Sequence, residues 1–223
     1  MANYDFQELL ARLNHLEDTD PGAAIREARR IVADGPQAPN LKVIQAAALV
    51  NAGVLIQARD AVEEGLALYR ELHSTFPTPD VKFNLATAII SAAAFTSEEG
   101  DRLDHLESTK ALRAEARGYF WHVAQNTEAA DAIRTQSWTN LANQLEGSFR
   151  FSEAHDARLA ALKLDPGNGV AAASAIRYLL SCYHQGLCSD LAIHEASALA
   201  QVARSNRDRI IEYAGLQAAN SIE

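Results

Sequence analysis

The sequence is poor in cysteine, with only two in 223 residues. Cys182 and Cys188 cannot form the disulfide framework that stabilises small secreted domains, so the cysteine content favours a reducing, cytoplasmic location. His184 and His194 lie near both cysteines in the sequence, but the tight Cys-x2-Cys spacing of structural zinc sites is missing. Cys182 also falls on an apolar helix face, as a small core residue would. We therefore expect no metal site and no cofactor.

Positive charge is also scarce, because 20 Lys and Arg residues stand against 29 Asp and Glu residues and give a formal net charge of -9. Proteins that bind nucleic acid or an anionic membrane surface usually present basic segments. No apolar run approaches the length of a membrane span, and the acidic, amphipathic start of the chain is no signal peptide. The sequence therefore predicts a cytoplasmic protein that binds neither nucleic acid nor a membrane.

Aromatic residues supply only 7% of the chain, whereas hydrophobic residues as a whole make up 48%. Alanine and leucine, which are strong helix formers, provide most of this apolar content. Strands would require more valine, isoleucine, threonine and aromatic residues. The composition therefore predicts an all-α protein whose helices pack closely through small side chains, with Trp121 and Trp138 among its few large core residues.

The clearest pattern lies in residues 138–166, where two amphipathic helices are joined by a short polar turn. Apolar residues recur in each helix at spacings of three and four, which place them on one face. The second helix is expected over residues 151–164, because Pro166 cannot continue a helix. One hairpin cannot bury its apolar face alone, so we expect similar hairpins beside it. The apolar positions are Trp138, Leu141, Ala142 and Leu145 in the first helix, and Ala154, Leu159, Ala161, Leu162 and Leu164 in the second.

Over about residues 135–168 this pattern resembles a tetratricopeptide repeat (TPR), a helix–turn–helix unit of about 34 residues. The clear departure is Arg158, which stands where the repeat has an aromatic residue. Phe149 and Phe151 lie nearby in the sequence, and we expect them to fill part of that space. The direct matches to the repeat are Trp138, Leu141, Ala154, Ala161 and Pro166.

The resemblance implies a right-handed superhelical solenoid of TPR-like helix–turn–helix hairpins, with a C-terminal capping helix and a single domain over residues 1–223. The other repeats are degenerate. One helix is expected to end at Gly53. The polar, acidic residues 96–106 predict an extended loop within a lengthened hairpin at about 79–126. The capping helix is expected at about 206–220.

The resemblance also indicates where a partner would bind. In TPR proteins the first helix of each hairpin lines a concave groove that takes up an extended peptide or a helix. A carboxamide offers donors and an acceptor to a peptide backbone, and an arginine can pair with a carboxylate. The simpler interpretation is that these are ordinary solvated helix residues. The groove candidates are Asn84, Gln136, Thr139, Asn140, Asn143, Ser174 and Arg177.

We therefore expect a non-enzymatic module that binds a protein or a peptide, with a homo-oligomer or a larger assembly left open. An alternative comes from Arg117 and His122, which match the Arg-x4-His pattern of HEPN-type ribonucleases of toxin and defence systems. There the arginine stabilises phosphate charge and the histidine acts as acid or base. Arg150 and His155 repeat the spacing, but they span the turn of the strong hairpin. Such matches also arise by chance in a chain with seven histidines.

Overall fold

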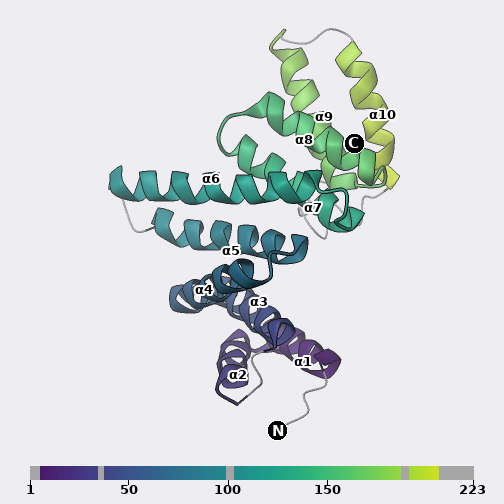
Figure 1. Cartoon of the computed structure of the whole chain (residues 1–223). Helices are drawn as coiled ribbons and strands as arrows, with labels where there is room; N and C mark the ends of the chain where they lie inside the picture. The colour runs from purple at the N-terminus through teal and green to yellow at the C-terminus, as the bar shows by residue number, and fades with distance from the viewer. Residues whose placement is uncertain (1–5, 35–37, 99–102, 187–190, 206–223) are drawn as a thin grey trace. The chain divides into compact units, whose positions relative to one another are not determined.

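The computed structural model describes residues 6–34, 38–98, 103–186 and 191–205, which form ten α-helices and no strand (Figure 1). The all-α prediction is therefore confirmed. None of these described helices is long and apolar enough to cross a membrane. The expected capping helix at about 206–220 lies outside the described residues.

The chain divides into two compact units, unit 1 (Met1–Tyr119) and unit 2 (Phe120–Glu223), and each is described by itself. The boundary between them falls inside one long helix, α6. The single domain over the whole chain stays a prediction, as does the lengthened hairpin within it.

Unit 1 is built from successive helices, and from α1 to α5 each helix packs against the next. Two side-chain caps begin helices of this unit. The Ala23 N–H donates to Asp20 Oδ1 at 2.9 Å, and the Val81 N–H donates to Thr78 Oγ1 at 3.3 Å. In each case a proline follows the cap and begins the helix. The helices are α1 (Phe6–Thr19), α2 (Pro21–Asp34), α3 (Pro39–Leu55), α4 (Arg59–Thr75), α5 (Pro79–Glu98) and α6 (Leu103–Gln125).

Glycines let α3 and α4 approach closely. A Cβ at Gly53 would lie 2.8 Å from Val62 Cγ2, and a Cβ at Gly65 would lie 2.7 Å from Val50 Cγ2. These distances are shorter than side chains tolerate, so the two backbones can touch only because the side chains are absent. The expectation that α3 ends at Gly53 was therefore wrong. The helix continues to Leu55, and the glycine serves packing rather than helix termination.

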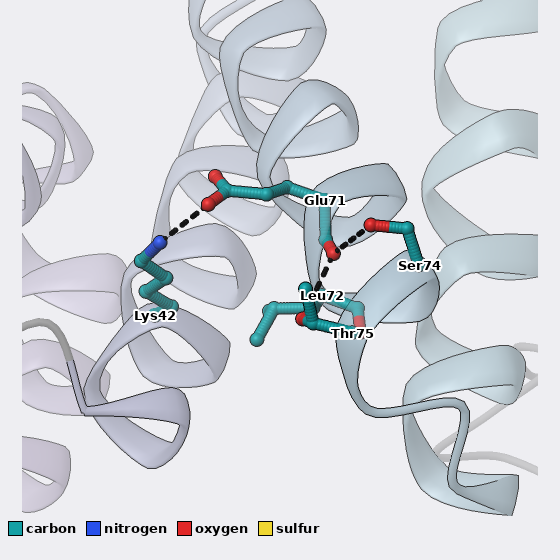
Figure 2. Close-up of polar contacts among 5 residues, drawn as sticks. All are labelled: Lys42, Glu71, Leu72, Ser74 and Thr75. Carbon is teal, nitrogen blue, oxygen red and sulfur yellow. Dashed lines mark hydrogen bonds and ion pairs between the residues drawn. The ribbon is translucent and has the colours of Figure 1, made fainter.

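Polar contacts fasten the C-terminal end of α4. Figure 2 shows the ion pair between Lys42 Nζ on α3 and Glu71 Oε1 on α4, which are 2.6 Å apart. The hydroxyls of Ser74 and Thr75 donate to the Glu71 carbonyl oxygen at 2.7 and 3.1 Å. Both hydroxyl bonds therefore lie in the last turn of α4, which ends at Thr75. The chain therefore leaves α4 at a defined point before it turns into α5.

The described parts of the segment 96–106, which are residues 96–98 and 103–106, are helical and do not form the predicted extended loop, and residues 99–102 lie outside the described residues. α5 continues to Glu98 and α6 begins at Leu103. Polar and acidic side chains indicated that this segment is exposed, but serine, glutamate and aspartate can all lie on the solvent side of a helix. Polarity alone was therefore not a sign of irregular backbone at the described ends of this segment.

Unit 2 follows the end of α6 with two further hairpins, α7–α8 and α9–α10, whose helices pack in pairs. The sequence prediction of 151–164 for the second helix of the strong hairpin matches α8. Asn168 caps α9, because its Oδ1 accepts the Ala171 N–H at 3.0 Å. Ala172, Ile176 and Leu179 of α9 pack in one core cluster with α10. The helices are α7 (Asp131–Glu146), α8 (Phe151–Leu164), α9 (Gly169–His184) and α10 (Leu191–Ser205).

Candidate binding face on the first helices of unit 2

The apolar face of α7 points into the hairpin, as the sequence predicts. Leu141, Ala142 and Leu145 are buried. Gln136 and Asn143 are exposed and Asn140 is half-buried. The spacing of four and then three residues places these carboxamides in one stripe along the helix. Within the described residues none of the three side chains has a hydrogen-bond partner.

The other predicted groove residues divide between the two units. Thr139, half-buried on α7, donates its hydroxyl to the Thr135 carbonyl at 2.9 Å. Ser174 is half-buried on α9, and Arg177 on the same helix is exposed. Asn84 is half-buried on α5, in unit 1, so the structure describes it apart from the others. Within unit 2 the candidate residues therefore lie on α7 and α9, and Asn84 is not among them.

An ionic network at the end of α7 was not predicted. Glu146 on α7 forms an ion pair with Arg158 on α8, and its Oε1 also lies 3.5 Å from Arg177 Nη2 on α9. Arg158 is only 3% exposed, whereas the Arg177 side chain is 66% exposed. One carboxylate thus holds a buried guanidinium in place and only weakly contacts a solvated one. Arg177 keeps most of its donors for a ligand.

Arg158 itself occupies the place of the expected aromatic residue. Phe149 is 82% exposed and Phe151 is 46% exposed, so the expectation that they fill this space was wrong. The three-carbon stem of an arginine can cover apolar surface while its head pairs with a carboxylate. The sequence signal for the network was therefore the departure from the repeat pattern at this one position.

His155 adds a second buried polar group to α8. Its ring lies on the Tyr178 ring of α9, with centroids 4.7 Å apart. Its Nδ1 is buried and has no hydrogen-bond partner in the described part of the chain. Burial lowers the pKa of His155 below its usual value, and Arg158 acts in the same direction, against Glu195 and Asp156. The uncharged imidazole is therefore the form that fits between α8 and α9.

The two tryptophans lie edge to face, with ring centroids 5.4 Å apart, one at the end of α6 and one on α7. Trp138 is half-buried, and Trp121 is 46% exposed. The expectation of a core position was therefore wrong for Trp121. The pair places two fluorescent reporters in unit 2.

The alternative nuclease pair is not brought together. Arg117 and His122 both lie on α6, and a spacing of five residues turns them about 140° apart around the helix axis. Arg150 precedes α8 and pairs with Glu153, whereas His155 is buried. Neither pair forms a site for phosphate, and the HEPN alternative has no support.

The residues weighed as zinc ligands show no cluster in the described ranges, where no group of three or more His, Cys, Asp or Glu side chains could hold a metal. Cys182 is buried in α9, as a core residue would be, and Cys188 lies outside the described residues.

Successive helical hairpins packed through small residues define a TPR-like fold. The chain is similar to the solved structure "MamA MSR-1 C2", with 15% identity and a TM-score of 0.56 over 90% of this chain and 96% of that one. It also matches the C-terminal part of a TPR repeat-containing protein from Cytophaga hutchinsonii, with 12% identity, 91% and 84% coverage and a TM-score of 0.34. No protein-family model and no curated protein matches the sequence. At such low identity the likeness to MamA shows the fold.

Proposed function

We propose that the protein is a non-enzymatic, cytoplasmic interaction module that holds a peptide or a segment of a partner protein against the first helices of its hairpins in unit 2. The stripe of Gln136, Asn140 and Asn143 along α7 is the observation that carries this proposal, because none of these carboxamides is used within the described structure. A TPR-like fold supports it, since stacked hairpins turn their first helices toward one concave surface.

The chemistry of the stripe suits a peptide backbone. A carboxamide can donate to a carbonyl oxygen and accept from an amide N–H, so a row of them can bind an extended chain without reading its side chains. Arg177 would then select a carboxylate on the ligand, which would take the place of its long contact with Glu146 at 3.5 Å. A homo-oligomer fits the proposal if the bound segment comes from a second copy of the chain.

The test is a comparison of matched baits. The full chain and its Asn140→Ala/Asn143→Ala variant are immobilised, proteins from the native host are captured, and the partners are identified by mass spectrometry. Each lost hydrogen bond should weaken the affinity for a true partner by about 1–3 kcal/mol, roughly 5- to 150-fold, in a titration with the purified partner. Stability should hardly change, because neither carboxamide has a hydrogen-bond partner in the described structure and alanine is the better helix former.

Gln201→Ala is the matched control, since it removes an exposed carboxamide from α10 in the same unit. It should leave capture and affinity unchanged. A partner that binds the double variant as tightly as the wild type would show that the α7 stripe is not its site.

A further inference from the structure

Three consecutive large apolar residues are exposed where α3 turns into α4. Val54, Leu55 and Ile56 are 38%, 61% and 47% exposed. Single exposed apolar side chains are common on protein surfaces, but a contiguous run of them marks an interaction site more often. The backbone holds this run outward, because Gln57 adopts a left-handed φ of 58° and the Ala58 N–H donates to the Gly53 carbonyl at 2.8 Å.

Carboxylates lie beside this turn on the side of α1. Asn51 Nδ2 on α3 donates to Glu17 Oε2 on α1 at 3.2 Å, so the C-terminal ends of the two helices are neighbours. Asp18 follows Glu17 and is exposed. Burial raises the pKa of Glu17, the hydrogen bond from Asn51 lowers it, and the charge of Asp18 raises it. A cation brought to this end of α1 would therefore relieve an unfavourable charge.

The first turns of α4, which follow the exposed run in the chain, add further carboxylates. Arg59 Nε pairs with Glu63 Oε1 at 2.7 Å. Arg29 of α2 bridges Asp60 and Glu64, at 2.8 Å from each. Carboxylates therefore outnumber guanidinium groups around the exposed run, and the net charge of the whole chain is also negative, at -9. The apolar run stands in an acidic surround, and that combination is complementary to one kind of partner surface.

We propose that the turn formed by Val54, Leu55 and Ile56, together with its acidic surround, docks a cationic amphipathic helix of a partner protein. The apolar stripe of that helix would cover Leu55 and Ile56, and its lysine or arginine residues would lie over Glu17, Asp18 and the start of α4. This surface lies in unit 1. It is distinct from the carboxamide stripe of the proposed function, and either can fail without the other.

The probes are two designed helical peptides of about 15 residues, one of leucine and lysine and one of leucine and glutamate with the same apolar pattern. Binding to the full-length protein is measured by fluorescence anisotropy at low and at high salt. The leucine–lysine peptide should bind, more weakly as salt rises, and the leucine–glutamate peptide should bind at least about tenfold more weakly. Equal affinity for both peptides would overturn the proposal.

Two pairs of variants locate the binding. Leu55→Ser/Ile56→Ser should weaken the leucine–lysine peptide by about tenfold or more, because two apolar side chains lose their cover. The matched control is Phe149→Ser/Phe151→Ser, which alters the exposed apolar turn of α7–α8 and should leave the affinity unchanged. Both turns are exposed, and thermal melts confirm that the variants fold. Equal weakening by the two pairs would mean unspecific apolar adhesion and would overturn the proposal.

A third pair tests the charge. Glu17→Gln/Asp18→Asn should weaken the leucine–lysine peptide severalfold, whereas Glu128→Gln/Asp156→Asn removes the same charge from exposed positions in unit 2 and should have no effect. Equal loss of affinity in both variants would mean that the peptide responds only to the net charge of the protein, and it would overturn the proposed site.

Sedimentation of the wild type gives one more decisive outcome. A dimer that Leu55→Ser/Ile56→Ser dissociates would make the occupant a second copy of this chain instead.

Discussion

The hairpins α3–α4 and α7–α8, both labelled in Figure 1, have the same type of turn between their helices but different side chains at matched positions. In each turn the residue before the second helix donates its N–H to a carbonyl five residues earlier, Ala58 to Gly53 at 2.8 Å and Arg150 to Leu145 at 3.0 Å. The residue before each donor is left-handed, Gln57 with a φ of 58° and Phe149 with a φ of 60°. Positions in the two hairpins can therefore be matched through the turn.

This match pairs Val54 and Leu66 of α3–α4 with Glu146 and Arg158 of α7–α8. One hairpin thus carries apolar side chains where the other carries an ion pair. The same type of hairpin therefore forms with either an apolar pair or an ion pair at these two positions. In unit 2 the carboxylate of Glu146 contacts arginines of both α8 and α9, and so links α7 to both helices.

The largest expected effect comes from breaking that ion pair on one side. Glu146→Val leaves the buried Arg158 guanidinium without its partner and should lower the free energy of unfolding of unit 2 by about 3 kcal/mol. The double variant Glu146→Val/Arg158→Leu copies α3–α4 and should recover most of that loss. Urea unfolding followed by the fluorescence of Trp121 and Trp138 measures both, because these tryptophans lie in unit 2.

Glu153→Val is the control for this series, since it removes the exposed ion pair with Arg150 and should lower the free energy of unfolding far less than Glu146→Val does. A double variant as unstable as the single one would break the comparison. The ionic pair would then be required by unit 2 and not interchangeable with the apolar pair of α3–α4.

Much of each hairpin could be predicted from the sequence because the signals were local. Apolar spacing and Pro166 gave the bounds of α8. Gly53 was misinterpreted because a glycine near a helix end has two uses, termination and close packing. Only the position of Val62 on the next helix decides between them.

The candidate site could be predicted only in part. Helical spacing was enough to place the carboxamides of α7 away from its apolar face. The contact of Glu146 with Arg158 and Arg177 depends on how three helices are rotated against one another, which no local pattern contains. Phe149 was misplaced for a related reason, because the left-handed turn points its side chain outward although the residue type suggests a core position.

A second prediction concerns how closely the two helices of each hairpin approach one another, which differs between α3–α4 and α7–α8. Gly65→Ala would place a Cβ 2.9 Å from the Ala46 carbonyl oxygen as well as against Val50, and backbone cannot move aside cheaply. We expect a loss of about 2 kcal/mol in thermal unfolding followed by circular dichroism. Gly147→Ala in the other hairpin is the control, since its φ is -62° and the nearest atom would be 3.5 Å away. It should be neutral or stabilising by about 0.5 kcal/mol, and an equal loss in both would contradict the close approach of α3 and α4.

The smallest expected effect tests the shared turn itself. A left-handed conformation costs a residue with a Cβ about 1–2 kcal/mol, and a glycine avoids this cost. Part of that stabilisation is lost again, because glycine makes the unfolded chain more flexible and so raises its entropy. Phe149→Gly should therefore stabilise unit 2 by about 0.5–1 kcal/mol in urea unfolding, whereas Phe149→Ala, which keeps the Cβ, should not. Gln57→Gly should gain less, because the Gln57 carboxamide donates to the Val54 carbonyl at 3.3 Å and that bond is lost. If Phe149→Gly and Phe149→Ala destabilise alike, the edge-to-face contact with Phe151, whose centroid lies 6.1 Å away, outweighs the strain. The two turns would then be alike in hydrogen bonding but not in energy.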